Sequence, residues 1–223
     1  MATRKRGPYG PYSPEETRKR LIDAGVNLFG EGGFLGTSVQ MIAERAGVTK
    51  GGFYHHFDSK DDLLRQIHYE YASRMLANMR EIGYSDSSAV DQLRAIIRCA
   101  AVTVGNYRWH VAIFYQEFRY LNGSSYDSIR KMHNQETSIV YDVIERGIAN
   151  GEFDSAINPK LLLFSISAIT AWIYQWYDPA GPMSLDAIAD GIADIILKGV
   201  EAPKRSSAPR GGTRTVADKA ASS

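Results

Sequence analysis

The sequence predicts an all-α protein, and three observations lead to that class. Apolar residues recur at the spacing of helix turns in one segment after another, whereas few segments alternate apolar and polar residues as strands do. Helix-start signals, such as Ser13-Pro14 and Asn158-Pro159, precede several of these segments. Glycines and clusters of Pro, Gly and Ser separate them. About nine helices, with no sheet and no internal repeat, are therefore expected.

The composition is that of a globular protein. Hydrophobic residues make up 44% and charged residues 23% of the 223 residues, which is ordinary for that class. No apolar run approaches the roughly 18 residues of a membrane span. The basic N-terminus is not followed by the apolar segment of a signal peptide. The single Cys99 suits a reducing compartment. We expect a cytoplasmic protein with no membrane partner and no cofactor.

Charge is distributed unevenly along the chain. Residues 1–60 hold nine basic and six acidic side chains, whereas residues 61–200 hold 12 basic and 17 acidic ones. Residues 201–223 are basic again, with five basic and two acidic side chains. A basic N-terminal end on an acidic body favours a polyanionic partner at that end.

The first helix is expected to follow a basic arm at residues 1–12. Ser13 is the expected N-cap, and Pro14 fits the first helical position. The stretch GEGGF contains Gly30, Gly32 and Gly33, and these glycines are expected to end the helix.

Two short helices joined by a tight turn are expected next. Thr37 or Ser38 caps the second helix, and Gly47 ends it. Thr49 caps a third helix that runs to about Phe57. Two short helices with this connection form a helix-turn-helix.

The third helix has the composition of a surface that meets DNA. Phe53 and Phe57 are expected to be buried, which leaves an outward group made of Lys50, Gly51, Tyr54 and His55. The Gly-Gly pair costs about 1 kcal/mol per residue in helix propensity. That cost is understandable if the backbone approaches a groove wall closely. Thr49 at the helix N-terminus and Lys60 at the start of the next helix are positioned to bind phosphates.

The neighbouring His55 and His56 raise the alternative of a metal site. Adjacent helical positions point about 100° apart, and no Cys or further His lies nearby in the sequence to complete a tetrahedral set. The chain also lacks the G-x-S-x-G, P-loop, G-x-G-x-x-G and H-E-x-x-H patterns. Neither a metal site nor an enzyme is expected.

The remaining helices are longer. The fourth helix begins after Asp58-Ser59 and covers residues 60–80, before the break GYSDSS. The later helices are expected over residues 89–107, 109–120, 125–150, 158–177 and 184–199. The composition of residues 201–223 predicts a disordered tail, because it offers little apolar surface to bury.

Residues 15–75, with TRKRLIDAGVNLFGEGGFLGTSVQMIAERAGVTKGGFYHHFDSKDDLL, resemble the N-terminal domain of TetR-family transcriptional regulators. The resemblance implies a TetR-like, all-α homodimer on a palindromic DNA operator. The implied organisation is a flexible arm at 1–12, a DNA-binding domain at 13–75 with its helix-turn-helix at about 37–57, a ligand-binding and dimerisation domain at 76–200, and the tail. The DNA contacts implied by family position are Thr37, Thr49, Lys50, Gly52, Tyr54, His55 and Lys60.

The C-terminal half resembles a branch of that family that responds to acyl-CoA thioesters in lipid or steroid breakdown. The segments that carry this resemblance are IFYQEFRYL, VIERGIANGEF and WYDPAGPMSLDAIADGIADIILKG. Members of the branch often carry arginine just before the WY pair, where this chain has Gln175. The apolar residues expected at the dimer interface of the last two helices are Phe164, Ile169, Ile192 and Ile196.

Aromatic residues in the C-terminal half predict an effector pocket, with a filled core as the alternative. The expected pocket residues are Trp109, Phe114, Tyr115, Phe118, Trp172 and Trp176. The cations expected to hold an anionic part of the effector are Arg108, Arg119 and Arg130, with solvated helix faces as the alternative.

The sequence thus favours a ligand-responsive repressor, released from its operator when an effector moves the fourth helix. A multidrug-type sensor with a promiscuous aromatic pocket is the alternative within the same class. A helical enzyme fused to a DNA-binding module is the alternative of another class, and the lack of a catalytic residue set in the sequence speaks against it.

Overall fold

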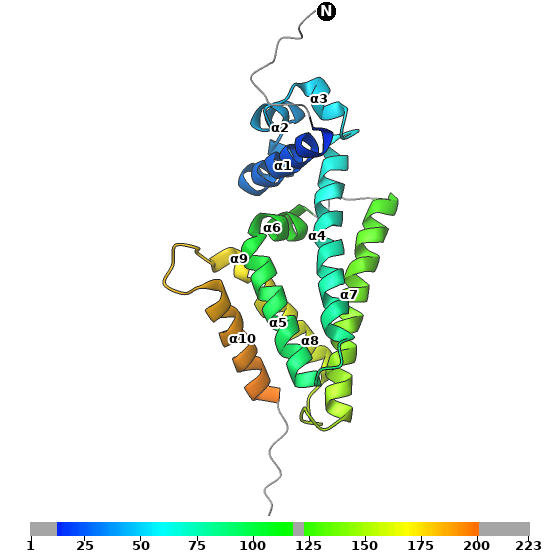
Figure 1. Ribbon diagram of the computed structural model, residues 1–223, viewed down its shortest axis with the longest axis vertical. Coiled ribbons are helices and arrows are strands. Elements are labelled where there is room, and N and C mark those ends of the chain that lie inside the picture. The colour runs from blue at the N-terminus through cyan, green and yellow to red at the C-terminus, as the bar shows by residue number, and fades with distance from the viewer. Residues whose placement is uncertain (1–12, 118–122, 201–223) are drawn as a thin grey trace, which may run out of the picture.

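The computed structural model describes residues 13–117 and 123–200, and the regular elements in those two ranges are helices (Figure 1). In chain order they are α1 (Pro14–Gly36), α2 (Val39–Arg45), α3 (Lys50–Tyr54), α4 (Lys60–Gly83), α5 (Ala89–Asn106), α6 (Arg108–Glu117), α7 (Gly123–Ala149), α8 (Pro159–Ala171), α9 (Ile173–Trp176) and α10 (Leu185–Val200). The all-α class is confirmed. Within the described ranges, none of the helices is both long enough and apolar enough to cross a membrane.

The chain forms a small helical unit at one end and a larger bundle at the other. Figure 1 shows α1, α2 and α3 together at one end, and α4 running from them into the bundle. The bundle contains α5, α7, α8 and α10, and α6 lies between it and α1.

Helix α1 begins as predicted but does not end where predicted. The Ser13 hydroxyl accepts a hydrogen bond from the backbone N–H of Glu16, which is the expected N-cap. The helix continues through Gly30 and is interrupted only at Gly33, whose φ of 74° and ψ of 161° kink it. The break predicted in GEGGF is therefore present at Gly33, but Gly30 lies inside the helix and a further turn follows as far as Gly36. A Cβ on Gly30 would lie 2.5 Å from the ring of Trp109, so this glycine permits close packing of α1 on α6.

The helix-turn-helix is built by two side-chain caps. Ser38 caps α2 by accepting from the N–H of Met41, so Ser38 and not Thr37 is the cap. The Thr49 hydroxyl accepts from the N–H of Gly52 at 3.0 Å and caps α3. Helix α3 ends at Tyr54 and not near Phe57.

The predicted helix over residues 158–177 is divided in two. The Asn158 side chain caps α8 by accepting from the N–H of Leu161, as its sequence signal indicated. Trp172 interrupts the helix, and the single turn α9 continues to Trp176. Trp172 lies between two helical segments, and this places its side chain at the surface.

Three apolar clusters form the core of the described residues, and α4 contributes buried residues to two of them. The first cluster joins α1, α2, α3 and the first half of α4, and also takes in Ile113 from α6 and Ile129 from α7. The second joins the rest of α4 to α5, α7, α8 and α10. Along α4, the change from one cluster to the other falls between Ala72 and Met75. A displacement of α4 in the bundle is therefore expected to change the packing of the helix-turn-helix, because packed interiors transmit strain.

Candidate functional site

The first candidate surface is the exposed side of α3 with its N-cap. Phe53 and Phe57 are fully buried, as predicted, and their rings pack together with centroids 5.7 Å apart. On the other side Lys50, Tyr54 and His55 are exposed. Tyr54 keeps 49% of its surface accessible, which is unusual for a large aromatic residue. The short helix is thus anchored by its inner aromatic residues and presents a cation, a phenol and an imidazole outward.

The two glycines of α3 have different structural roles. A Cβ on Gly52 would lie 3.3 Å from the Cβ of Val48, so the turn packs tightly against this residue. A Cβ on Gly51 would meet only the Thr49 hydroxyl, at 3.7 Å. Nothing in the described structure therefore requires glycine at position 51, whereas a partner that approaches the backbone closely would require it.

Two of the predicted DNA contacts are held inside the domain. The Thr37 side chain is buried, and its hydroxyl lies 2.9 Å from the carbonyl of Gly33 and 3.1 Å from that of Leu28. The Lys60 ammonium donates to the carbonyls of Phe34 and Thr37, at 2.7 and 2.8 Å. Both side chains therefore stabilise the kinked end of α1. We correct the prediction for Thr37, whose hydroxyl is not available to a phosphate, while Lys60 has one N–H left to donate.

The histidine next to the outward group is partly covered. Burial, followed by the neighbouring His55 and then Arg18, lowers the pKa of His56. The Arg18 guanidinium lies over the Phe57 ring and bonds to Glu70 and Gln66 of α4. These contacts hold α1, the end of the helix-turn-helix and α4 together. Among the described residues, no cluster of three or more His, Cys, Asp and Glu is arranged to hold a metal ion.

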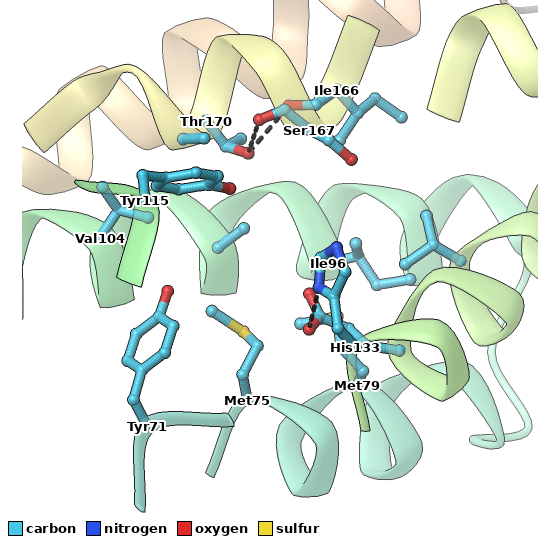
Figure 2. Close-up of a pocket in the computed structure, with 14 residues that line it drawn as sticks. Tyr71, Met75, Met79, Ile96, Val104, Tyr115, His133, Ile166, Ser167 and Thr170 are labelled. Atoms are coloured by element: carbon cyan, nitrogen blue, oxygen red, sulfur yellow. Dashed lines mark hydrogen bonds and ion pairs between the residues drawn. The ribbon is translucent and has the colours of Figure 1, made fainter. Parts of the chain in front are cut away.

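The second candidate site is a cavity of about 70 Å³ inside the bundle (Figure 2). Helices α4 and α5 contribute apolar residues together with Tyr71, and α8 contributes Ile166, Ser167, Thr170 and Ala171 from the opposite wall. Tyr115 of α6 lies between these walls, and α7 adds His133, Glu136 and Val140. Ligand sites usually offer about 300–1,000 Å³, so an organic ligand would occupy this cavity together with the adjoining space at Tyr115 and Ala171.

The polar groups of the cavity are few. The Nδ1 atom of His133 lies 3.7 Å from a carboxylate oxygen of Glu136. This hydrogen-bonding pair raises the pKa of His133. Burial, and then the Glu136 charge, raises the pKa of both Tyr71 and Tyr115, so both phenols are neutral donors at physiological pH. The described lining contains no lysine and no arginine.

A second hollow, of about 380 Å³, adjoins the cavity at Tyr115. It is lined by Tyr115, Ala168, Ala171, Trp172 and Tyr174. The rings of Tyr115 and Tyr174 are nearly parallel, with centroids 6.2 Å apart. Tyr115 thus separates an inner cavity from an outer aromatic hollow.

The predicted ligand residues do not all meet at this cavity. Tyr115 lines both spaces and Trp172 lines the outer one. The expectation for Trp109 is corrected, because it packs against the core cluster of the DNA-binding end. Phe114 also packs against that cluster, but its ring contacts Tyr71, Tyr115 and His133 of the cavity lining. Trp176 is exposed and lines neither space. Phe118 lies outside the described residues.

The predicted anion-binding arginines are also placed elsewhere. The Arg108 guanidinium lies over the Trp109 ring, 4.7 Å from its centroid. Arg130 is an exposed residue of α7 and does not line the cavity. Arg119 lies outside the described residues. For Arg130 the structure supports the alternative of a solvated helix face, whereas Arg108 is half-buried against Trp109.

Three ionisable lining residues were missed at the sequence level: Tyr71, His133 and Glu136. A signal for the last two exists in the sequence. Ile129, His133, Glu136 and Val140 follow one helix face at the spacing i, i+4, i+7 and i+11, and both Ile129 and Val140 are buried. Polar residues on an otherwise apolar helix face indicate a cavity or a buried polar network.

An exposed apolar face covers part of α8 and α10. On α8 it consists of Leu161, Phe164, Ile169 and Trp172, and on α10 of Ile195. The predicted interface residues Phe164 and Ile169 belong to this face. Ile196 does not, because it is 8% exposed and packs inside its own subunit. Ile192 is also packed against the core, so these two expectations are corrected in favour of Ile195.

Comparison with known proteins agrees with both parts of this description. Residues 21–67 match the family model described as "Bacterial regulatory proteins, tetR family", and residues 86–200 match "Tetracyclin repressor-like, C-terminal domain". The chain is 29% identical over 188 residues to the HTH-type transcriptional repressor KstR2 of Rhodococcus jostii, covering 83% of this chain and 92% of that protein. It is 25% identical over 190 residues to the fatty acid metabolism regulator protein of Bacillus subtilis, covering 81% and 94%.

Solved structures show the same fold. The ketosteroid transcriptional regulator KstR2 of Mycobacterium tuberculosis superposes with a TM-score of 0.79 at 24% identity, over 83% of this chain and 95% of that one. AibR, solved in complex with isovaleryl coenzyme A and operator DNA, superposes with a TM-score of 0.72 at 24% identity, over 80% and 97%.

Proposed function

Because the chain belongs to the TetR family of bacterial transcriptional regulators, we propose that it is a repressor whose release from a palindromic operator is caused by an acyl thioester in the α4–α8 cavity. The chain is a DNA-binding regulator with an N-terminal helix-turn-helix and a C-terminal helical domain. The observation that carries the proposal is that α4 starts at the helix-turn-helix and lines the cavity farther along.

The DNA-binding part of the proposal assigns α3 and its cap to the major groove. Thr49 and the α3 N-terminus bind phosphate, and Lys50, Tyr54 and His55 reach the groove. Gly51 lets the backbone approach, since no described neighbour fills the space beside it. In a homodimer that pairs the exposed apolar faces of α8 and α10, two copies of α3 reach half-sites about 34–36 Å apart. The protein acts in the cytoplasm, where its operator lies.

The effector part rests on the lining of the cavity and on its relatives. The wall residues are mostly apolar and aromatic, which suits an acyl chain or ring system at about 25 cal/mol per Å² of apolar surface removed from water. The regulator from Bacillus subtilis is named for fatty acid metabolism, and AibR was solved with isovaleryl coenzyme A. We therefore assign an acyl thioester to this cavity.

Release follows from the course of α4 and α6. Tyr71, Met75 and Met79 of α4 line the cavity, while the first residue of α4, Lys60, is bonded to the end of α1. Tyr115 of α6 also lines the cavity, and Trp109 of the same helix packs on Gly30 of α1. A ligand that fits only a displaced arrangement of these helices shifts the population away from the one that fits the operator.

One observation favours a second candidate function. A carboxylate, Glu136, lies in an aromatic cavity, and such a combination also suits hydrophobic cations. A multidrug-type sensor is therefore the competing function. Neither function includes catalysis, in keeping with a family of regulators.

The two functions are separated by titrating the protein–operator complex, followed by fluorescence anisotropy of labelled operator. The titrants are free coenzyme A, short- and long-chain acyl-CoAs, the matching free acids, and hydrophobic cations. Release by acyl-CoAs alone supports the proposal. Release by several unrelated cations, with no response to any thioester, replaces it with the multidrug function.

A further inference from the structure

The ionisable side chains around the α4–α8 cavity suggest how its ligands are selected by charge. In the described lining these side chains are Tyr71, Tyr115, His133 and Glu136. Both tyrosines are neutral, for the reasons given above. The electrostatics of the cavity therefore depend on the two residues of α7, which lie on successive turns of the same face.

Glu136 is the more enclosed member of the pair. Its side chain is 26% exposed, compared with 50% for His133. Among the described residues, Glu136 forms its ion pair with His133. The neighbouring walls are Met75, Met79 and Ile96, with Ile166 opposite. The carboxylate is partly screened by water, since a quarter of its side chain is exposed, but at close range it still repels an anion that enters the cavity.

An anionic ligand group is disfavoured in this cavity. A free carboxylate from a fatty acid would enter beside Glu136, and no lysine or arginine of the described lining would compensate it. Like charges at close range in a poorly solvated site raise the pKa of one partner or prevent its entry. A ligand ammonium, in turn, would compete with His133 for the same carboxylate.

A neutral polar group meets suitable partners instead. A carbonyl oxygen accepts hydrogen bonds from the phenols of Tyr71 and Tyr115, which are donors. A ligand hydroxyl donates to the Glu136 carboxylate. An ester, a thioester or a hydroxyl-bearing ring therefore satisfies the polar groups of the cavity without introducing a charge.

We propose that Glu136, paired with His133, is a charge filter: it admits ligands whose buried part is uncharged and carries a carbonyl or hydroxyl, and it rejects the corresponding free acids. This inference rests on the proposed effector cavity and specifies the ligand class that the cavity takes. Charged portions of a larger effector, such as phosphates, stay outside the cavity.

The test measures direct binding of three ligands of equal chain length to the purified full-length protein at pH 7.5, by calorimetry and without DNA. The ligands are methyl octanoate, octanoate and octylammonium. Wild-type protein is expected to bind the ester at least about tenfold more tightly than the acid, a difference of about 1.4 kcal/mol. Glu136→Gln, which keeps the shape and removes the charge, is expected to reduce that ratio to about twofold or less by strengthening acid binding.

Two further variants make the result specific. Asp142→Asn removes one negative charge from an exposed position of the same helix, and it is expected to leave the ester-to-acid ratio unchanged. His133→Gln removes the imidazole that pairs with Glu136, and it is expected to weaken acid binding further and to strengthen octylammonium binding. This opposite shift provides a test even if Glu136→Gln does not fold.

Any of three outcomes would overturn the filter. Wild-type protein binds the ester and the acid equally tightly, Glu136→Gln changes the affinities for ester and acid by the same factor, or octylammonium is the ligand that binds most tightly. The outcome for the operator is read separately. Operator release by acyl-CoAs with no ester-to-acid discrimination removes the filter and keeps the proposed function. Discrimination without any release by thioesters keeps the filter and removes the thioester as effector.

Discussion

Single residues decide which parts of the helix-turn-helix face outward. Thr37, Thr49 and Lys60 are all polar, and all lie at helix ends where phosphates bind in principle. Only Thr49 is exposed with its hydroxyl at a helix N-terminus. Thr37 bonds inside α1, and Lys60 bonds mainly to backbone carbonyls. Sequence alone could not separate them, because the kink at Gly33 determines which carbonyls turn inward.

At this scale we predict that Tyr54→Ala and Lys50→Ala each abolish specific operator binding while leaving a folded dimer. Both side chains are exposed on α3, so their removal takes no packing from the core. Loss of one base or phosphate contact costs about 1–3 kcal/mol. The measurement is operator affinity by anisotropy, with circular dichroism to check folding. Glu81→Ala, an exposed change on α4, is the control. Wild-type affinity in either folded variant would remove that residue from the contact set.

A second residue-scale prediction concerns acid stability. Burial, followed by the neighbouring His110, lowers the pKa of His68 to about 4. The unfolded chain, with an ordinary histidine pKa near 6.5, therefore binds more protons than the folded chain between these values. Folding stability is thus lost as pH falls through that window. Burial lowers the pKa of His110, and the charges of Asp23, Glu70 and Arg74 also act on that pKa.

The expected loss for His68 is about 2 kcal/mol in the free energy of unfolding between pH 6.5 and pH 4.5. Urea unfolding at the two pH values measures it. His68→Gln, which keeps a polar side chain without a titratable ring, should remove most of that difference. An equally steep pH dependence in this variant would assign the acid sensitivity to other groups.

Helices form the next scale, and most of them could be predicted. Ser13, Thr49 and Asn158 cap helices where their sequence signals placed them, because capping is a local interaction. The errors are tertiary. Gly30 is a helix breaker by propensity, but here it lies within a helix that packs on Trp109. The aromatic residues of α6 were expected in one pocket, whereas Trp109 faces α1 and Tyr115 faces the cavity.

The contact of α1 with α6 gives a prediction with a matched control. Gly30→Ala places a methyl group 2.5 Å from the Trp109 ring, so it is expected to lower stability by about 1–3 kcal/mol through overpacking. Gly32→Ala, in the same helix with no neighbour within 4 Å, is expected to be neutral or to stabilise by up to about 1 kcal/mol. Thermal unfolding measures both. A Gly30→Ala protein as stable as Gly32→Ala would show that α6 does not pack tightly on α1.

The whole molecule combines a basic N-terminal arm with the helix-turn-helix and the bundle. Arg4, Lys5 and Arg6 of the arm lie outside the described residues, and their contribution stays a prediction from charge. Deleting residues 2–7 should reduce the slope of log affinity against log salt by up to about three phosphate contacts, with little change in operator preference. Anisotropy at several salt concentrations measures it. An unchanged slope would show that the arm does not touch DNA.

If a cavity ligand and the operator compete through α4, each must weaken the binding of the other. Thermodynamic linkage tests this competition most directly. The affinity of a long-chain acyl-CoA is measured calorimetrically for the free protein and for the protein saturated with operator, and the affinity for operator is measured with and without the thioester. The operator is expected to weaken thioester binding, and the thioester to weaken operator binding, by the same factor, about 5- to 150-fold for a coupling of 1–3 kcal/mol. Equal thioester affinity for the free and the operator-bound protein would contradict it.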